Sequence, residues 1–236
     1  YDALRRSTHL YVQVGAGPEK LLQRRLYGDD AGITTPETNK LRGKLVRQFD
    51  GAGVSRAQQF DFKGNPLATD RKIPLSYQTP DWSALTTVTT VAAADSAASS
   101  LLTAETFSET TAFDALNRVT SHTTPDSSQF LPTYNEAGLL ETVQVKIRGA
   151  STATAFVSNI EYNEKGQRTA IQYGNGTSTA YTYDALTFRL TRLVTTRVSP
   201  AASLQDLSYT FDPVGNIVQI SDAAQQALFY DDAFVA

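Results

Sequence analysis

The stretch that decides the fold is YNEAGLL, at residues 134–140. It joins an aromatic residue, Tyr134, directly to Asn135, and Gly138 follows three residues later, ahead of two leucines. A Tyr or Phe followed at once by Asp or Asn occurs nine times in the 236 residues, where random order of this composition would give roughly two. A pair that recurs this often indicates an array of repeated units, each of them one supersecondary element.

The nine pairs share the chemistry of a tight turn. An Asp or Asn side chain can bond the backbone two residues on, and a following Gly or Asn accepts the positive φ that closes the turn. Six of the pairs have Gly or Asn three residues after the Asp or Asn, whereas the others have Arg5, Thr187 and Phe234 there. The residues assigned to repeat turns are Tyr1, Asp2, Phe49, Asp50, Gly53, Phe60, Asp61, Gly64, Phe113, Asp114, Asn117, Tyr134, Asn135, Gly138, Tyr162, Asn163, Gly166, Tyr183, Asp184, Phe211, Asp212 and Gly215, with a ninth pair at Tyr230 and Asp231.

The aromatic residue ahead of each turn suits a half-buried strand, because aromatic side chains pack well on a pleated surface. Each unit is therefore predicted to run as strand, tight turn and strand, which makes the chain all-β. Gly138, Gly166 and Gly215 are expected at positive φ, since each closes a turn that Asp or Asn opens.

These units resemble the repeat of the RHS, or YD-repeat, family, which runs roughly Tyr-Asp-x-x-Gly-Arg/Asn-Leu. The runs at 41–45, 60–67, 134–140 and 183–190 are more specific. They are similar to the RHS region of the B component of bacterial toxin complexes, large proteins with an SpvB-like start. Between Phe113 and Phe211 the intervals of 21, 28, 21 and 28 residues are close to the family's spacing. The resemblance covers nearly the whole chain.

The resemblance implies antiparallel β-hairpins that form part of a spiralling sheet, a shell that encloses a toxic polypeptide. Its implied partners are the remainder of that shell, the enclosed toxin and other toxin-complex subunits, in a secreted or extracellular setting. The chain contains no Met and starts inside a repeat unit. We therefore expect residues 1–236 to be a single RHS segment of a much larger protein.

Composition excludes several classes of function. A net charge of −3 gives no electrostatic footprint for nucleic acid. No run of 18 apolar residues exists, so no membrane span is expected. The absence of Cys removes disulfides, thiolate catalysis and cysteine-based zinc sites. The chain is therefore expected to need no cofactor or metal.

Two segments depart from the repeat. Residues 83–106 are rich in Ala, Ser and Thr and are treated as an insertion, within which residues 91–104 are predicted to form a short helix. Near the start, residues 10–14 and 21–27 are predicted to pair as strands, and residues 36–40 to form one helical turn.

Candidate chemistry is sparse. His9 and His122 lie in no spaced ligand cluster, so both are expected at solvent-facing strand positions. The run Asp212-Pro213-Val214-Gly215 resembles elements of the RHS core whose aspartates support self-cleavage, but it follows Phe211 as an ordinary repeat turn. Asn175-Gly176-Thr177 matches a glycosylation sequon, yet its surroundings favour a hairpin turn. No catalytic, cofactor-binding or metal residue is predicted.

Three hypotheses for the function remain. The first is a non-catalytic shell segment, the second a β-surface that binds carbohydrate or a cell-surface partner, and the third an enzyme, which has only the weak aspartate pattern behind it. Aromatic placement separates the first two. Repeat aromatics buried between strands indicate structure, whereas several Tyr lining one open groove indicate binding.

Overall fold

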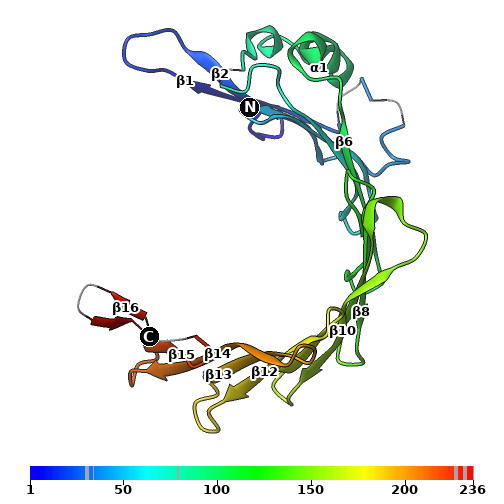
Figure 1. The fold of residues 1–236 in the computed structure, drawn as a ribbon. Coiled ribbons are helices and arrows are strands. Elements are labelled where there is room, and N and C mark those ends of the chain that lie inside the picture. The colour runs from blue at the N-terminus through cyan, green and yellow to red at the C-terminus, as the bar shows by residue number, and fades with distance from the viewer. Residues whose placement is uncertain (30–31, 34, 79, 226–227, 231–232, 236) are drawn as a thin grey trace. The chain divides into compact units, whose positions relative to one another are not determined.

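The computed structural model describes residues 1–29, 32–33, 35–78, 80–225, 228–230 and 233–235 (Figure 1). The chain divides into two compact units, which we call unit 1 (Tyr1–Ser127) and unit 2 (Ser128–Ala236). Each unit is built on antiparallel strands that follow one another in chain order. Strands make up nearly half of the chain, which confirms the predicted all-β class.

In unit 1 each strand pairs antiparallel with the strand that follows it in sequence. The strands are β1 (His9–Val12), β2 (Lys20–Tyr27), β3 (Leu45–Asp50), β4 (Gly53–Phe60), β5 (Pro66–Lys72), β6 (Phe107–Phe113) and β7 (Val119–Thr123). The first predicted strand ends two residues early, at Val12, and residues 36–40 form turns rather than a helical turn.

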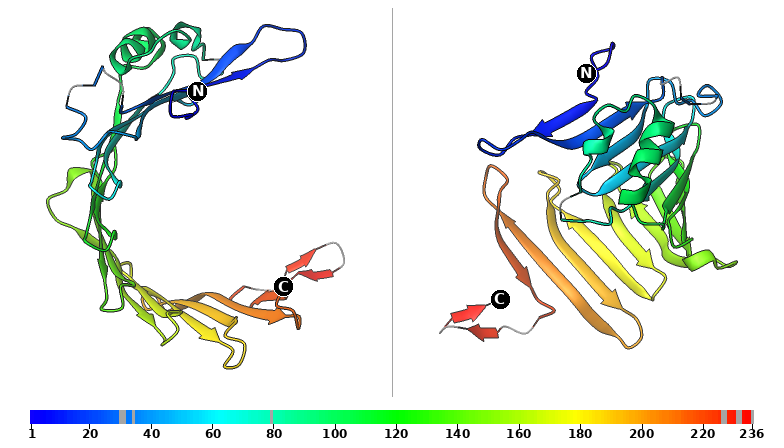
Figure 2. Two further views of the ribbon diagram at one scale, coloured as in Figure 1. Left: turned by 180° about the vertical axis from the view of Figure 1, so that it is seen from behind. Right: turned by 90° about the horizontal axis from the view of Figure 1, so that it is seen from above.

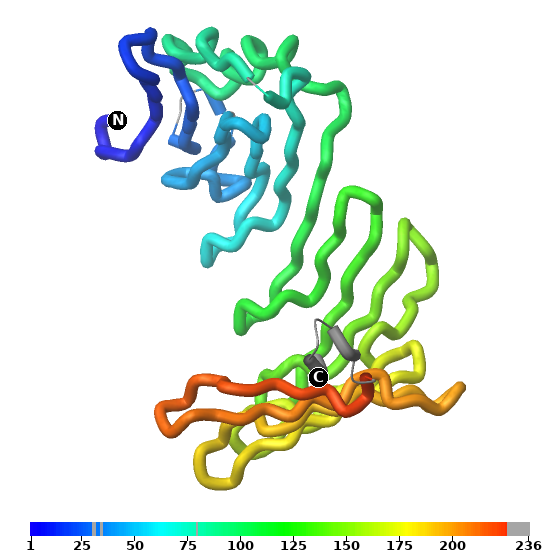
Figure 3. Tube along the Cα trace, turned by 60° about the vertical axis from the view of Figure 1, so that its left-hand side comes forward, coloured from blue at the N-terminus to red at the C-terminus, as the bar shows by residue number. Residues whose placement is uncertain are grey.

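Unit 2 continues the same pattern, and Figure 3 follows the backbone from each strand into the next. Its main sheet comprises β8 (Gln129–Tyr134), β9 (Leu140–Lys146), β10 (Thr154–Tyr162), β11 (Arg168–Tyr173), β12 (Thr177–Tyr183), β13 (Leu190–Arg197), β14 (Ala202–Phe211) and β15 (Ile217–Asp222). A short 3₁₀ turn, η3 (Ile147–Gly149), follows β9. Strands β16 (Leu228–Tyr230) and β17 (Ala233–Val235) form a separate hairpin.

The predicted helix exists but is shorter than expected. Helix α1 (Val91–Ala98) begins after Thr90, whose side chain accepts a hydrogen bond from the Ala93 N–H at 3.3 Å. It continues as the 3₁₀ turn η2 (Ser99–Leu101), and a second 3₁₀ turn, η1 (Ser83–Leu85), precedes it. The helical stretch stops before Leu102, which is extended and forms a β-bridge with Pro74.

The Ala-rich segment supplies part of the core of unit 1, and α1 lies over one face of the sheet (Figure 2). Trp82 and Leu85 are buried against Phe49 of the sheet, and the Trp82 and Phe49 rings meet edge to face at 5.5 Å. The Trp82 indole N–H donates to the Asp50 carbonyl at 3.0 Å. In the helix, Ala94 has no exposed surface, so its small side chain lets α1 pack closely on the strands.

Unit 2 has a much thinner core. Among its described residues the buried apolar ones are Val145, Ile160 and Ile171, and Thr179 is buried with its hydroxyl 2.8 Å from that of Thr195 on the next strand. No α-helix occurs among the described residues of this unit. Cross-strand pairs and turns must therefore hold its register, because little second layer is present to do so.

The core of unit 1 makes a prediction that a matched pair of variants tests. Phe49→Ala should lower the free energy of unfolding by about 3–5 kcal/mol, since the ring is fully buried against Trp82. Phe62→Ala removes the same ring from a position that is 82% exposed and should change stability by less than about 0.5 kcal/mol. Urea denaturation measures both, and equal losses would contradict this core.

Candidate functional site at the repeat-turn edge

The aromatic–Asp/Asn pairs stand where strands end. The aromatic residue is the last of its strand at Phe60, Phe113, Tyr134, Tyr162, Tyr183, Phe211 and Tyr230. Successive hairpin turns alternate between the two ends of the strands, so within each unit these turns lie along one border of the sheet, where the strands end. We call this the repeat-turn edge. In unit 1 it holds residues 2–6, 28–29, 35–44, 61–65 and 114–118, and in unit 2 residues 135–139, 163–167, 184–189 and 212–216.

The Asp114 turn shows the geometry in full. One carboxylate oxygen, Oδ1, accepts the N–H groups of Leu116 at 2.8 Å and Arg118 at 2.9 Å. The other, Oδ2, accepts from Arg118 Nε at 2.7 Å. Along the main chain, Asp114 N–H donates to Arg118 O at 2.9 Å and Asn117 N–H to Asp114 O at 3.1 Å. The carboxylate thus satisfies turn amides that no strand neighbour reaches.

The same closure recurs at Asp2, Asp61, Asn135, Asn163 and Asp212. In each, the side-chain oxygen accepts the N–H of the residue four positions on. That residue also pairs through its side chain in five turns, as Arg6, Asn65, Arg118, Gln167 and Asn216. This partner position was not singled out from the sequence, although the Arg/Asn of the RHS repeat is its signal.

Positive φ occurs where the turn chemistry predicts it. Gly138, Gly166 and Gly215 have φ of 79°, 74° and 104°, which confirms the expectation for all three. Arg5 takes a φ of 61° at the same position without being glycine. The Asp184 turn is one residue longer. There Phe188 has the positive φ, and the Thr187 hydroxyl donates to the Asp184 carboxylate at 2.8 Å.

The Phe49–Asp50 pair lies at the opposite edge and is built differently. Asp50 pairs directly with Gly53 in a short hairpin, and its Oδ1 accepts the Ala52 N–H at 2.9 Å. Gly53 is required there, because a Cβ would stand 2.1 Å from the Lys72 carbonyl oxygen. Two assigned aromatics are special: Phe49 belongs to the core, and Tyr1 is 89% exposed. Asp231 lies outside the described residues.

Tyrosine hydroxyls connect one repeat turn to the next within each unit. The Tyr162 hydroxyl donates to Leu140 O at 2.7 Å, and the Tyr183 hydroxyl to Arg168 O at 2.9 Å. Each acceptor lies five residues after the Asn that opens the preceding turn. In unit 1 the Tyr27 hydroxyl reaches Ser7 O at 3.1 Å, five residues after Asp2. We call these contacts the tyrosine ladder.

Tyr27 identifies a repeat turn that the sequence conceals. The N–H of Gly28 donates to Lys44 O at 2.8 Å, as Asp114 N–H does to Arg118 O, and Gly43 has a φ of 74°. The described residues from Gly28 to Lys44 (28–29, 32–33 and 35–44) thus belong to a repeat turn that is longer than the others. Gly28 replaces the usual Asp because a Cβ would stand 1.9 Å from Leu41 O. The Asp29 carboxylate accepts from Arg6 at 2.7 Å and from Gly43 N–H at 3.1 Å.

Further contacts join neighbouring turns. Arg189 donates to the Asp212 carbonyl at 3.1 Å and lies over the Phe211 ring, whose centroid is 5.6 Å from the guanidinium carbon. The Gln167 side chain donates to Phe188 O at 2.8 Å. In unit 1, Asn65 donates to the Asn117 side chain at 3.1 Å. The repeat-turn edge of each unit is therefore a connected polar network.

Hydrogen bonds hold the turn carboxylates ionised. The Arg118 N–H lowers the pKa of Asp114, the Thr187 N–H that of Asp184, and the Asn216 side-chain amide that of Asp212. Asp212 accepts from Gly215 N–H, Asn216 N–H and Asn216 Nδ2 at 2.7–2.8 Å. Three donors of the same turn therefore share its two carboxylate oxygens, and Asp212 serves as the acceptor that closes this turn.

The two histidines take no part in the repeat turns. His9 is not solvent-facing as predicted: it is half-buried, its Nδ1 lies 2.9 Å from the Thr8 hydroxyl, and its Nε2 has almost no exposed surface. Burial, and then the charge of Arg24, lower the pKa of His9. His122, also half-buried, contacts the Thr111 hydroxyl at 3.0 Å. Among the described residues no group of three or more His, Asp or Glu is placed to hold a metal.

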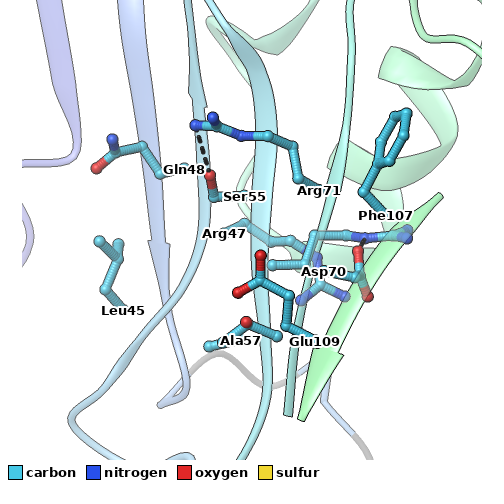
Figure 4. A pocket seen from close by; sticks show the side chains of 11 residues that line it. Leu45, Arg47, Gln48, Ser55, Ala57, Asp70, Arg71, Phe107 and Glu109 are labelled. Carbon is cyan, nitrogen blue, oxygen red and sulfur yellow. Dashed lines mark hydrogen bonds and ion pairs between the residues drawn. The ribbon is translucent and has the colours of Figure 1, made fainter. Parts of the chain in front are cut away.

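A cleft of about 480 Å³ lies on the sheet of unit 1, and Figure 4 shows the side chains that line it. Arg71 donates to the Ser55 hydroxyl there at 3.2 Å, and Arg56 forms an ion pair with Asp70. Arg47 pairs with Asp95 of α1 at 3.0 Å. These charges are used within the unit, and no nucleophile–base contact is seen among the described residues that line the cleft. No described helix is long and apolar enough to cross a membrane.

No protein-family model matches the chain. Two curated relatives from Yersinia entomophaga do. Toxin subunit YenC1 is 29% identical over 217 residues, which cover 90% of this chain and 21% of the subunit. Toxin subunit YenC2 is 31% identical over 209 residues, which cover 85% of this chain and 21% of the subunit. The chain thus spans about a fifth of the length of these relatives.

Solved structures share the fold over nearly all of the chain. A TcdB2-TccC3-Cdc42 structure matches 98% of it with a TM-score of 0.81 and 25% identity, over 10% of the solved chain. The Photorhabdus luminescens Tc holotoxin pore with a mutated TccC3 matches 97% of it with a TM-score of 0.79 and 26% identity, also over 10% of that chain.

The lowered carboxylate pKa values predict acid sensitivity of a stated sign. A group whose pKa is lower in the folded chain stabilises it above the unfolded value, 3.8 for Asp114, and this contribution is lost as pH falls through the folded pKa. Asp114→Asn should therefore weaken the dependence of stability on pH below about 3.8. Asn163→Asp, the reciprocal change in an equivalent turn, should strengthen it. Urea titrations between pH 2 and 6 measure both, and unchanged slopes would contradict the role of these carboxylates.

Proposed function

This chain is an RHS-like toxin-complex protein, and we propose that it is a non-catalytic segment of the wall of a β-shell that encloses and shields a toxic polypeptide. The proposal takes residues 1–236 as one RHS segment of a longer subunit. The observation that carries it is the repeat-turn edge, where the turns are closed internally and neighbouring turns are joined by the tyrosine ladder or by side chains such as Asn65 and Arg189.

A wall has physical requirements that this chain meets. It must cover area with one layer of sheet, so its register depends on strand pairs and turns rather than on a deep core. Unit 2 has that character. Few of its described apolar residues are buried, and its strands pair over long stretches, as β12 does with β13 from Thr177–Arg197 to Tyr183–Leu190. Function through enclosure needs no single reactive side chain, which agrees with the three hydrogen bonds that Asp212 accepts within its own turn.

The names of the relatives refine the choice of component. The sequence resemblance pointed to the B component, whereas the relatives are toxin subunits YenC1 and YenC2, and the solved chains join TcdB2 with TccC3. We therefore favour a C-type subunit as the longer protein. Its partners would be the rest of the shell, the enclosed toxin and other subunits of a secreted complex.

Carbohydrate or cell-surface binding is the alternative. It requires several tyrosines on one open groove. The hydroxyls of Tyr27, Tyr162 and Tyr183 instead donate hydrogen bonds within the tyrosine ladder. Tyr11 and Tyr77 do line a cleft of about 890 Å³ in unit 1, and neither is a repeat aromatic. Glycan binding that disappears in Tyr77→Ala would favour this alternative.

The shell proposal is tested in the longer subunit with its enclosed polypeptide. Val194 pairs with Ala180 on one side and Asp206 on the other, so Val194→Pro removes pairing inside a central strand. We expect added protease to degrade the cargo in Val194→Pro and to spare it in the matched control Val194→Thr, which keeps a β-branched residue.

Asp212→Asn separates enclosure from catalysis in the same assay. It should leave both cargo protection and any release of the toxin by cleavage intact, because Asp212 acts within its turn. Loss of cleavage in a well-folded Asp212→Asn subunit, or equal protection of the cargo in Val194→Pro and Val194→Thr, would overturn the proposal.

A further inference from the structure

The loop between β11 and β12 carries a chemically distinctive pair. Asn175 and Gly176 are exposed at the tip of this hairpin, at the edge of unit 2 opposite the repeat-turn edge. They form the single Asn-Gly sequence in the 236 residues. The Gly176 N–H donates to Tyr173 O at 3.1 Å, and Gly176 has a φ of 80°, so the loop closes as the hairpin predicted from the sequence.

The Asn175 side-chain carbonyl is polarised by its neighbours. Its Oδ1 accepts the Thr177 N–H at 3.1 Å and the Thr177 hydroxyl at 2.7 Å. Two donors on one carbonyl oxygen stabilise the negative charge that develops there when a nucleophile adds to the carbon. Cγ of Asn175 is therefore an activated electrophile.

The nearest nucleophile is the main-chain nitrogen of Gly176. Gly176 lies in open space, because no atom beyond its two chain neighbours would stand within 4 Å of a Cβ at this position. A glycine also leaves the backbone free to rotate toward the side chain that precedes it. The hydrogen bond from Gly176 to Tyr173 must open first, which makes local opening of the hairpin part of the barrier.

From this geometry we propose that Asn175 is a site of spontaneous covalent modification in the folded chain, by cyclisation onto Gly176 and loss of ammonia. The Gly176 nitrogen loses its proton and bonds to Cγ of Asn175, the bond from Cγ to the amide nitrogen breaks, and that nitrogen leaves as ammonia with the proton. Water then opens the five-membered imide at either carbonyl. The products are aspartate and isoaspartate, and no electron transfer is involved.

Asn163 shows why the two donors alone are insufficient. Its Oδ1 also accepts two main-chain N–H groups, from Lys165 and Gln167, each at 3.0 Å. Its Nδ2 donates to the Gln167 side chain at 2.9 Å. The next residue is Glu164, so the main-chain nitrogen that would attack belongs to a residue with a side chain and not to a glycine. Asn163 should therefore react far more slowly, and it serves as an internal control.

The two products differ in their effect on the hairpin. Aspartate at 175 keeps the oxygen that accepts from Thr177 and adds one negative charge. Isoaspartate lengthens the main chain by one carbon inside a tight loop. This disturbs the bond from Gly176 to Tyr173 and the one from Val198 N–H to Gly176 O at 3.3 Å, which reaches the end of the neighbouring strand. This edge of unit 2 would loosen with the age of the molecule.

The test ages the folded chain at mildly alkaline pH and follows its tryptic peptides by mass spectrometry. Peptide 169–189 contains Asn175 as its one asparagine, and peptide 149–165 contains Asn159 and Asn163. We expect peptide 169–189 to gain the mass of an amide-to-acid conversion and to split into two products, at least tenfold faster than peptide 149–165 is modified. The rate should rise with pH, because the attacking nitrogen must lose its proton.

Thr177→Val removes the hydroxyl donor and keeps the main-chain N–H, so it should slow the reaction severalfold without changing the fold. Circular dichroism of this variant verifies that the sheet persists. Modification of peptide 169–189 no faster than that of peptide 149–165 would overturn the proposal. An unchanged rate in a folded Thr177→Val chain would overturn the activation by Thr177.

Discussion

The rest of this structure depends on one hydrogen bond that recurs in the repeat turns. The N–H four residues after the opening Asp or Asn donates it to the side-chain oxygen of that residue. Tight turns leave main-chain N–H groups that no strand neighbour reaches, and an unsatisfied group costs about 1–3 kcal/mol when it is buried. In the Asp114 turn one carboxylate serves two such groups and the side chain of Arg118 as well. Because this closure repeats from turn to turn, the aromatic residue that precedes each such turn lies at the equivalent position, at the end of its strand.

That regularity explains the tyrosine ladder. A hydroxyl at the end of β10 or β12 reaches the carbonyl at the equivalent position after the preceding repeat turn, because these turns have the same internal geometry. Unit 1 shows how much variation the arrangement tolerates. The turn from Gly28 to Lys44 is longer than the others, yet Gly28, Gly43 and Lys44 preserve the closing bond and Tyr27 still supplies its hydroxyl. Unit 1 adds a second source of stability in Trp82 and α1, whereas unit 2 depends on its strands and turns.

Local chemistry made the turns predictable from sequence. An aromatic residue, then Asp or Asn, then Gly three residues later specifies a turn through nearest neighbours alone, and Gly138, Gly166 and Gly215 take the expected φ. Tertiary effects were not predictable in this way. Phe49 carries the repeat signature but is recruited to the core by Trp82, and His9 is covered instead of solvated. The turn at Gly28 was missed because a close approach to Leu41 replaced its Asp with Gly.

Hydrogen exchange of individual amides in the native chain, followed by NMR, tests most directly whether the turns are the structural constraint. The account predicts that the N–H groups of Arg118, Gln167 and Asn216, which donate to turn side chains, exchange as slowly as those inside β12 and β13. The exposed loop at residues 151–153 should exchange rapidly and provides the reference. Turn amides that exchange as fast as this reference loop would contradict the account.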